Sequence, residues 1–593
     1  MLYGKNSKGK LVNILESHKD EKYICGVCGE ELTRCFGLQK QYFSHSKDKA
    51  KECELKLKRQ LELEKEELDK KAINILHEEY YCKDFGDIKV DMSDTESEEG
   101  YRLTKEQMDI INSEEDKIVI NASAGASKSY TLYRYAKERP NTKFLYLVYN
   151  KAMQIEAENL FSDCPNVTVK TTHGLAYGYE GKNYRRKLTF SYKPIDVFKD
   201  LDLSDNAFEL AVQVHTLLNE FMLSSKHSIN DMDLYTDKIF ANQKDRIYTL
   251  AKKLWEMKCD TDNNIKVEHD FYLKKFHLSK KNLSKKFDCV MIDEAQDSNE
   301  MVFDMMLNMK TKGIVIVGDQ FQAMYQFRKA KNIMSMLECA KEYKLTTSFR
   351  VSQAIANISN ILLSDVYGID FGMKGFNDKN KIVDKLNEKK PYMVLARTNA
   401  TLFSECINAI DSGKKKLYFE GGFNSYRFND ILDCYNFSEG DYVNNSKLNK
   451  FDDYTKMVEY AEKNEDVELL SLINAVKRYG DRIPQLISRI RKTDCPDRDK
   501  ADVGFCTIHK SKGQTYENVR IMDDCFSMED YFNKIFIEKI EDKRGNPERS
   551  NLIKSAKSEV CILYVAITRA KGKIELNDDL KRYLVLRHQY SNK

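Results

Sequence analysis

The sequence predicts an α/β fold with parallel sheets, and three stretches carry that prediction. In residues 118–129, 287–297 and 313–319 an apolar run ends abruptly in small or acidic residues. Short apolar runs bounded in this way are typical of buried strands, and open α/β sheets bind ligands at the carboxyl ends of their strands. Core packing alone does not explain three such units in one chain, so we expect a ligand site at the sheet edge.

The first stretch, KIVINASAGASKS, predicts a phosphate-binding loop between a strand and a helix. Backbone N–H groups of such a loop and the helix N-terminus attract a polyphosphate, Lys128 reaches its oxygens, and Ser129 holds Mg²⁺. The pattern G-x-x-x-x-G-K-S/T is incomplete, because its glycine positions fall on Ala122 and Ser127 and only Gly125 remains. The alternative is a strand, a turn and a helix with a surface lysine.

The second and third stretches supply polar groups at strand ends. Asp293 and Glu294 follow the run FDCVMI, where Asp293 can hold Mg²⁺ through its water shell and Glu294 can deprotonate an attacking water. GIVIVGD repeats the pattern and is followed by Gln322. Upstream, the amide of Gln107 can offer a donor and an acceptor to an adenine edge, although alone it would mark an ordinary helix start.

The composition limits the class of protein. The 593 residues are enough for several domains, and 96 Lys and Arg against 93 Asp and Glu give a formal net charge of only +3. Nucleic-acid binding must therefore come from local grooves, for which the lysine-rich residues 274–287 are a candidate and a solvated surface is the alternative. No apolar run approaches the roughly 18 residues of a membrane helix, and the start MLYGKNSKGK has no signal segment. We expect a soluble cytoplasmic protein with no membrane partner.

Five of the 15 cysteines fall in the first 82 residues and predict a zinc-binding module over residues 1–55. So short a segment has little core of its own, and Zn²⁺ would supply the missing stability; unpaired structural thiols are the alternative. The segment KYICGVCGEELTRCFGLQKQYFSHS is similar to the zinc-ribbon-like module of CoiA-type competence proteins, but none of that family's nuclease carboxylates can be placed here. The expected ligands are Cys25, Cys28, His45 and Cys53.

Residues 56–100 are expected to connect this module to the rest of the chain. They begin with a charged helix whose leucines lie at helical spacing, either a plain connection or a face for a partner. They end in DMSDTESEEG, an acidic linker at a domain boundary.

Ten motifs occur in the order and approximate spacing of the UvrD/Rep/PcrA-like superfamily 1 DNA helicases. The resemblance spans about residues 101–575. KTTHGLAY, HDFYLKKF and the Asn-Lys of LVYNKA resemble the branch that contains the F-box DNA helicases, although no F-box is apparent. The motifs are LTKEQ, ASAGASKS, LVYNKA, TTHGLA, VMIDEAQD, IVGDQFQAMYQFR, LTTSFR, VLARTN, TIHKSKGQTYENV and LYVAITRAK.

The resemblance implies a site for ATP and Mg²⁺ shared by two lobes. Gln107 would read the adenine and Phe349 would stack on it. Arg350 and Arg569 would reach the phosphate from the second lobe, as arginine fingers do. The other nucleotide, catalytic and Mg²⁺ residues that it implies are Ala124, Gly125, Ala126, Ser127, Lys128, Ser129, Asp293, Glu294 and Gln322.

The resemblance also implies a track for single-stranded DNA and for its junctions with duplex. Aromatic faces accept any base, so stacking allows stepping without sequence preference, whereas core packing is the alternative for Tyr325 and Phe327. The residues that match DNA-contacting positions are Tyr149, Thr172, His173, Tyr325, Phe327, His509 and Lys510.

Two positions depart from the family pattern. Ser127 replaces a loop glycine, and we expect slower handling of the nucleotide. Thr515 stands where UvrD-like proteins usually place a glutamate toward the ribose, and Glu517 is not in register to replace it.

The implied architecture is two RecA-like P-loop NTPase lobes, each with a mainly helical insertion. Within the second insertion, YTKMVEYAEKNEDVELLSLINAV predicts helices and KKKLYFEGG predicts a strand and a turn. This insertion or the amino-terminal module would bind a protein partner. The first lobe would comprise 101–179 and 284–335 around insertion 180–283, and the second 336–400 and 501–593 around insertion 401–500.

The implied function is an ATP-dependent helicase or translocase on single-stranded DNA, moving 3′ to 5′ by analogy with the family, in repair, recombination or replication. Two alternatives stay open. One is a translocase or anti-recombinase that strips proteins from DNA without much unwinding. The other is an ATP-binding DNA sensor with slow turnover in a phage or defence system.

Overall fold

The computed structural model describes most of the chain beyond residue 102 and parts of what precedes it. The chain divides into two compact units, Met1–Lys83 with Lys581–Lys593 and Asp84–Leu580. No helix within the described ranges is long and apolar enough to cross a membrane. The described residues are 3–5, 11–13, 23–24, 31–36, 41–44, 70–83, 90–96, 102–204, 207–232, 243–323, 333–443, 445, 448–449, 451–463, 466–540 and 548–592.

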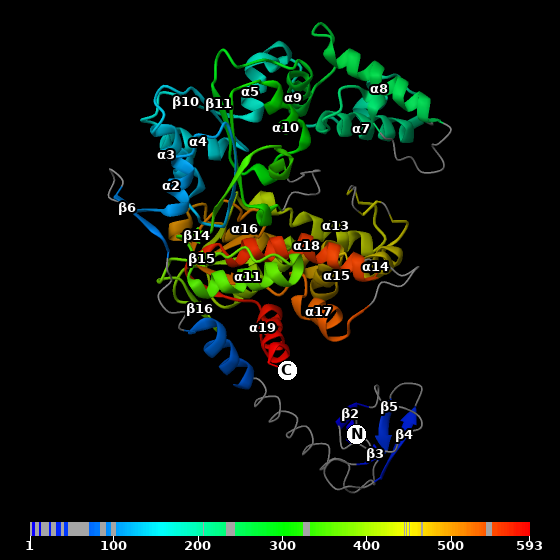
Figure 1. The fold of residues 1–593 in the computed structure, drawn as a ribbon. Coiled ribbons are helices and arrows are strands. Elements are labelled where there is room, and N and C mark those ends of the chain that lie inside the picture. Colours follow the sequence, from blue (N-terminus) through cyan, green and yellow to red (C-terminus); the bar gives the residue numbers. More distant parts are fainter. Residues whose placement is uncertain are drawn as a thin grey trace. The chain divides into compact units, whose positions relative to one another are not determined.

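The smaller unit contains an antiparallel sheet with the strand order β2-β1-β3-β4-β5 (Figure 1). Tyr23 and Leu32 lie opposite each other in this sheet and are both buried. The expected zinc ligands Cys25, Cys28, His45 and Cys53 lie outside the described residues. The strands are β1 (Tyr3–Lys5), β2 (Leu11–Asn13), β3 (Tyr23–Ile24), β4 (Glu31–Phe36) and β5 (Gln41–Ser44).

The expected charged helix is described only from residue 70. Residues 70–76 are helical and continue into the π-helix η2 (His77–Tyr81). The hydroxyl of Tyr80 donates to the carbonyl oxygen of Leu584 at 3.1 Å. This bond joins the two chain segments of the smaller unit.

The expectation of a linker over residues 91–100 is corrected, because part of this segment forms a strand. β6 (Met92–Glu96) pairs antiparallel with β7 (Arg102–Thr104). An acidic segment can form such a strand because backbone hydrogen bonds, rather than buried side chains, define the pairing.

The first lobe of the larger unit is centred on a six-stranded sheet in which every pairing is parallel. All five residues of β9 are buried, as expected for a parallel strand covered on both faces. In spatial order the strands are β10 (Val167–Thr171), β9 (Phe144–Val148), β11 (Cys289–Ile292), β12 (Gly313–Gly318), β8 (Lys117–Ala122) and β13 (Lys341–Leu345).

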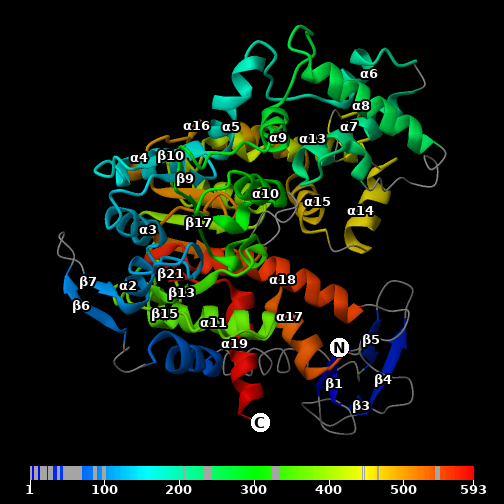
Figure 2. The ribbon, with the colours of Figure 1, turned by 45° about the horizontal axis from the view of Figure 1, so that its top comes forward.

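The expected boundary of this lobe at residue 335 is wrong, because β13 pairs with β8 beyond it. Figure 2 shows α3 and α4 beside the sheet, and α4 packs against β9 and β10. The helices of the lobe are α2 (Lys105–Ile111), α3 (Lys128–Lys137), α4 (Lys151–Leu160), α5 (Thr172–Tyr179), η7 (Ala295–Asp297), α10 (Glu300–Asn308), η8 (Gln320–Gln322) and η10 (Ile333–Met336).

The first insertion is helical, as expected, and shares its hydrophobic core with the lobe. α9 joins the two parts, because it packs against α5 and α10 of the lobe and against α7 of the insertion. Trp255 packs there against Phe221 and Phe271. The helices are η3 (Gly181–Tyr184), α6 (Pro194–Asp200), α7 (Phe208–Leu223), η5 (Ile229–Asp231), α8 (Lys244–Cys259) and α9 (His269–Leu278).

The second lobe also has a six-stranded sheet in which every pairing is parallel. Residues 417–419 form a strand at the edge of this sheet, although they lie within the expected insertion 401–500. The expected boundary at residue 401 is therefore wrong, because the insertion begins only after this strand. The strands in order are β16 (Lys381–Val383), β21 (Ala570–Glu575), β20 (Tyr516–Ile521), β17 (Tyr392–Ala396), β19 (Val503–Thr507) and β18 (Leu417–Phe419).

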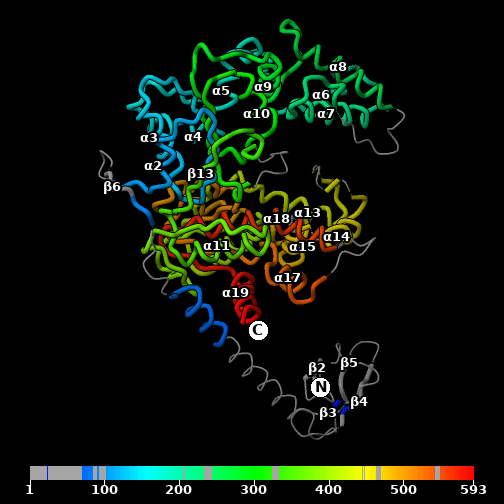
Figure 3. Tube along the Cα trace, viewed as in Figure 1, coloured from blue at the N-terminus to red at the C-terminus, as the bar shows by residue number. Residues whose placement is uncertain are grey.

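The chain trace in Figure 3 brings α11 and α18 of this lobe side by side, and the two helices are packed together. A short parallel pair, β14 (Thr347–Ser348) and β15 (Lys374–Gly375), precedes the sheet. The helices are α11 (Gln353–Tyr367), α12 (Asn399–Asp411), α17 (Met528–Phe532), η14 (Asn533–Ile537) and α18 (Glu548–Ile567). The last helix, α19 (Asp578–Ser591), belongs to the smaller unit from Lys581 onward.

The second insertion follows the expected pattern of helices. The strand and turn predicted at KKKLYFEGG are β18 followed by Gly421 and Gly422, whose φ angles are 76° and 85°. The elements are η11 (Phe423–Tyr426), α13 (Asn429–Ser438), α14 (Tyr454–Lys463), α15 (Val467–Tyr479), η12 (Gly480–Arg482), α16 (Ile483–Lys492) and η13 (Arg498–Lys500).

Candidate active site

A cavity of about 380 Å³ lies where the carboxyl ends of β8 and β11 face the second lobe. Parallel strands end at the same edge of a sheet, which is why residues far apart in sequence meet here. The expected residues that line the cavity are Gly125, Ala126, Ser127, Lys128, Ser129, Asp293, Glu294, Gln322, Arg350 and Arg569.

The loop after β8 takes the shape of a phosphate cradle despite its missing glycines. Gly125 has a φ of 75°, and a Cβ added there would lie 2.6 Å from the Cβ of Arg350, so only glycine fits. Ser127 has a φ of 56° and precedes the first residue of α3. This left-handed conformation costs a non-glycine residue about 1–2 kcal/mol. The carbonyl oxygen of Ser127 accepts a bond from the Thr131 hydroxyl at 3.0 Å, which holds the first turn of α3.

The polar groups that line the cavity pair with one another. Lys128 Nζ lies 2.8 Å from Glu294 Oε1, and the Ser129 hydroxyl donates to Asp293 Oδ2 at 2.8 Å. A second donor to Asp293 Oδ2 is the hydroxyl of Tyr146 in β9, at 2.6 Å. A polyphosphate entering the cradle would compete with Glu294 for Lys128.

The surroundings of the neighbouring Asp293 and Glu294 carboxyls shift their pKa values in opposite directions. Burial, followed by the charge of Glu294, raises the pKa of Asp293 above its usual range. Burial alone would also raise the pKa of Glu294, but Lys128 and then Lys512 outweigh it and lower that pKa. Glu294 is therefore ionised and able to accept a proton.

The residues expected to hold Mg²⁺ fit a hard cation. Ser129 and Asp293 present a hydroxyl and a carboxylate oxygen 2.8 Å apart. Mg²⁺ prefers such oxygen ligands and usually keeps several waters as well.

Two arginines of the second lobe line the cavity opposite Lys128. Arg569 is buried and bonds only to uncharged oxygens, among them the carbonyls of Val565 at 2.9 Å and Gln514 at 3.2 Å. Arg350 donates to the carbonyl of Thr568 at 3.3 Å. Burial, followed by the nearby charge of Arg350, lowers the pKa of Arg569 to about 9. Among the described residues, neither guanidinium forms an ion pair with a carboxylate, so a bound anion would relieve their repulsion.

Gln322 belongs to a hydrogen-bonded chain that crosses between the lobes. Its amide donates to Asp319 Oδ2 at 2.7 Å, and the Tyr564 hydroxyl donates to the same oxygen at 3.1 Å. The backbone N–H of Ala124 in turn donates to Tyr564 Oη at 3.0 Å. A residue of α18 therefore contacts both the phosphate loop and the end of β12.

Three of these side chains were not predicted as site residues. Lys512 donates to Asp297 at 2.6 and 2.7 Å and to the carbonyl oxygen of Gln322 at 2.6 Å, which adds a buried ion pair between the lobes. Burial raises the pKa of Asp297 to about 6, although Lys512 opposes the shift. Lys512 and Tyr564 stand inside motifs that the sequence had singled out, whereas Tyr146 had no signal beyond one hydroxyl in an apolar strand.

The expected adenine-reading residues do not line the cavity. The Gln107 amide oxygen accepts from the Thr104 N–H at 2.9 Å, and its amide nitrogen donates to Thr131 at 3.1 Å. Phe349 meets Phe376 edge to face, with ring centroids 5.7 Å apart. Thr515 lines a separate cavity of about 480 Å³ in the second lobe.

Three of the expected DNA-contacting residues of the first lobe lie together. Tyr149, Thr172 and His173 line a second cavity of about 520 Å³ beside Asp293 and Asp297. Helix caps set the local backbone. Asn150 follows Tyr149 and is the N-cap of α4, because its side chain accepts the Met153 N–H at 2.9 Å. Thr171 precedes Thr172 and is the N-cap of α5, because its hydroxyl accepts the Gly174 N–H at 2.9 Å.

The expected contacts His509 and Lys510 of the second lobe do not line this cavity. Lys510 donates to the carbonyl oxygen of Ser425 at 2.9 Å and lies 3.7 Å from the ring centroid of Tyr426. His509 precedes it in the turn after β19. Tyr325 and Phe327 lie outside the described residues.

The comparison with known families agrees with this geometry. Residues 103–344 match the model of the UvrD/REP helicase N-terminal domain. The expected resemblance to superfamily 1 DNA helicases is thereby confirmed, and the match covers the phosphate loop, the DEAQD acids and the whole first sheet up to Lys344.

The branch is also confirmed by similarity to two longer proteins. The chain is 28% identical over 523 residues to F-box DNA helicase 1 of Gallus gallus and 26% identical over 530 residues to F-box DNA helicase protein 1 of Schizosaccharomyces pombe. Both alignments cover 82% of this chain, but they cover 50% and 58% of the relatives, so the chain spans about half of their length. A probable DNA helicase II homolog of Mycoplasma genitalium is 30% identical over 118 residues, which are 18% of this chain and 16% of that protein.

Proposed function

We propose that this chain is an ATP-dependent DNA helicase or translocase that moves on single-stranded DNA. The observation that carries the proposal is the shared cavity, in which Lys128, Ser129 and Glu294 of one lobe face the guanidiniums of Arg350 and Arg569 of the other, which pair with no carboxylate in the described part of the chain. A site completed only by both lobes links hydrolysis to their closure. The helicase names of the similar proteins support DNA as the substrate.

Each side chain has a distinct role in the proposed reaction. Lys128 leaves Glu294 to bind the β- and γ-phosphates, and the freed Glu294 takes a proton from the attacking water. Arg350 and Arg569 stabilise the charge that develops on the transferred phosphoryl group. Mg²⁺ bound by Ser129 and Asp293 would neutralise phosphate charge. Gln322, bonded to Asp319, would report on the γ-phosphate to the rest of the first lobe.

Beyond this, we propose a 3′ to 5′ direction and a role in DNA repair, recombination or replication, both by analogy with the family. Tyr149, Thr172 and His173 would contact the strand along the second cavity. A junction between single-stranded and duplex DNA would be the entry point for unwinding.

The decisive experiment is steady-state ATP hydrolysis with and without single-stranded DNA. The proposal expects DNA to stimulate hydrolysis strongly, and it expects Lys128→Ala to abolish the stimulated rate, because the phosphates lose their cationic partner. Lys312→Ala serves as the control for loss of a lysine, since Lys312 is exposed, pairs with Asp116 and lies outside the cavity. Equal slow turnover in all samples would contradict a motor and favour a DNA sensor, the function that the strained Ser127 would suit.

Strand displacement separates the two kinds of motor. With a radiolabelled or fluorescent strand on a tailed duplex, a helicase releases the strand in proportion to ATP consumed. A translocase that strips proteins instead consumes ATP and displaces a DNA-bound protein, but leaves the duplex intact. Substrates with a 3′ or a 5′ tail give the direction.

A further inference from the structure

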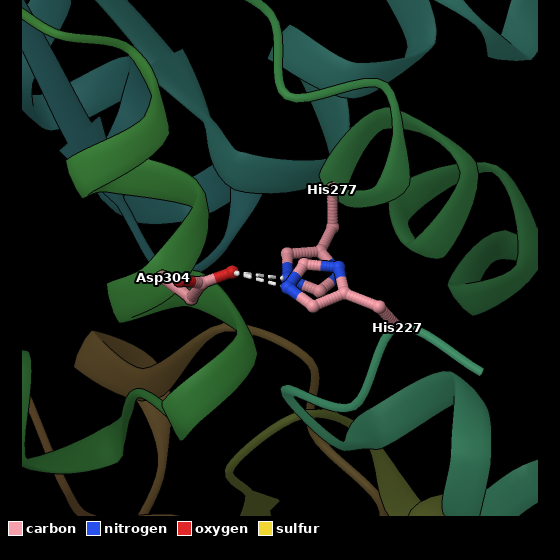
Figure 4. Close-up of side chains that lie close together, drawn as sticks. All are labelled: His227, His277 and Asp304. Atoms are coloured by element: carbon pink, nitrogen blue, oxygen red, sulfur yellow. Dashed lines mark hydrogen bonds and ion pairs between the residues drawn. The ribbon is translucent and has the colours of Figure 1, made fainter. Parts of the chain in front are cut away.

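A cluster of two histidines and an aspartate lies away from the nucleotide cavity, where the first insertion meets its lobe. His277 belongs to α9 and Asp304 to α10, and His227 lies between α7 and η5. Figure 4 shows the two imidazole rings side by side, with both directed at the carboxylate of Asp304. One candidate ligand atom from each residue lies within 4.8 Å of the others.

The distances are close to those of a metal centre. His277 Nε2 lies 2.7 Å and His227 Nε2 lies 3.7 Å from the same oxygen, Asp304 Oδ2. Ligand atoms of a tetrahedral Zn²⁺ site, with arms of about 2.0–2.2 Å, lie about 3.3–3.6 Å apart. Adjustments of about 1 Å would therefore place a cation between the three side chains.

The surroundings orient the ligands as a metal site requires. The Asn308 amide donates to Asp304 Oδ2 at 3.0 Å, one turn along α10. Lys274 Nζ donates to the carbonyl oxygens of Ser224 and Lys226, at 2.7 and 2.6 Å, and so fixes the segment that carries His227. Hydrogen bonds around the metal-binding side chains hold those side chains in position and are typical of metal centres.

Hydrogen bonding within the protein does not fully account for His277. Its ring is completely buried, yet among the described residues Nδ1 has no hydrogen-bond partner. The ring is held through Nε2, which faces Asp304 Oδ2 and is the atom that an ion between the three side chains would bind. The His227 side chain is 45% exposed, so an ion can reach the cluster from solvent and keep a water as a further ligand.

We propose that His227, His277 and Asp304 bind a divalent transition-metal ion, with Zn²⁺ favoured by two imidazoles and one carboxylate. Because the ligands come from the insertion and from α10, the ion would fasten the insertion to the first lobe. The proposal does not depend on ATP hydrolysis or on DNA binding.

The test compares two histidine variants of the full chain in a Cys28→Ser background, which impairs the zinc site expected from the amino-terminal cysteines. His227→Ala removes the exposed ligand and leaves the bond between His277 and Asp304 intact. His269→Ala is the matched control, since His269 belongs to the same insertion and bonds to Tyr272 instead. Chelator-stripped protein is dialysed against Zn²⁺, and bound metal and melting temperature are measured.

The control is expected to bind one more equivalent of Zn²⁺ than His227→Ala and to show a larger rise in melting temperature with the metal. Asp304→Asn, which keeps the side-chain size, is expected to weaken binding by about tenfold or more. Equal metal content and equal melting shifts in His227→Ala and the control would overturn the proposal and leave an ordinary hydrogen-bonded histidine.

Co²⁺ provides an independent readout. The additional equivalent bound by the control should show the absorption of nitrogen and oxygen ligands without a thiolate charge-transfer band. A thiolate band in the difference between the control and His227→Ala would assign that ion to cysteine and overturn the proposal.

Discussion

Ser127 has a backbone conformation that glycine adopts freely and serine does not. Its φ of 56° lies in the left-handed region, at the first turn of α3 and beside Lys128. The packing of the loop maintains this strain, because Gly125 lies close to Arg350 and the Thr131 hydroxyl donates to the carbonyl oxygen of Ser127. Strained residues of this kind concentrate at functional sites. The serine therefore alters the stability of the cradle without removing its shape.

We expect Ser127→Gly to stabilise the protein by about 0.5–1 kcal/mol, since relief of about 1–2 kcal/mol of strain exceeds the entropic cost of a glycine. The melting temperature of the larger unit should rise slightly, and ATP hydrolysis should be no slower than in the wild type. Ser352→Gly is the matched control, because Ser352 has a φ of −75° and no strain to lose. A melting temperature lowered equally in both variants would contradict the strain argument.

At the scale of elements, an aromatic cluster packs the helices of the first insertion against one another. Trp255 of α8 meets Phe221 of α7 at 5.3 Å and Phe271 of α9 at 4.9 Å between ring centroids. Phe271 is fully buried, and α9 also contacts α5 and α10. The position of α7 and α8 relative to the lobe therefore depends on the packing of these rings.

We expect Phe271→Ala to destabilise the insertion by about 3–5 kcal/mol, because it leaves a cavity beneath Trp255. Trp255 is the only tryptophan, so its fluorescence reports this region alone. The thermal transition followed by that fluorescence should shift to lower temperature. Phe190→Ala is the control, since Phe190 lies in the same insertion and is 97% exposed. Similar shifts in both variants would show that the cluster does not hold the insertion together.

At the scale of the molecule, polar side chains connect the two lobes beside the cavity. One connection is the buried pair of Lys512 and Asp297, and another is the chain from Ala124 through Tyr564 to Asp319. Both end on segments that carry residues of the candidate active site. Movement of one lobe therefore changes the environment of the phosphate loop and of the strand ends.

We expect Tyr564→Phe to lower kcat/KM for ATP by about tenfold, because the Ala124 N–H and Asp319 each lose a buried partner. This expectation depends on the proposed ATPase activity and is measured in the presence of single-stranded DNA. Tyr531→Phe is the control, since its hydroxyl donates to the Asp365 carbonyl within the second lobe at 3.4 Å. Equal kinetics in the two variants would show that the Tyr564 hydroxyl does not couple the lobes.

The sequence by itself determined the class of fold and most of the residues that line the candidate nucleotide cavity. Lys128, Asp293 and Glu294 follow strand-forming runs directly, and the ends of parallel strands meet at one edge, so local pattern was sufficient. Arg350 and Arg569 had no local signal, but the order of the motifs predicted them, and both line the cavity.

Only the tertiary structure decided which strands join which sheet and which distant side chains meet. β13 and β18 are short, and their sheet membership depends on partners far along the chain rather than on their own residues. The pairing of Lys512 with Asp297 and the cluster of His227, His277 and Asp304 arise in the same way. Periodicity records which face of an element is buried but not what lies against it, so contacts between elements had to come from the fold.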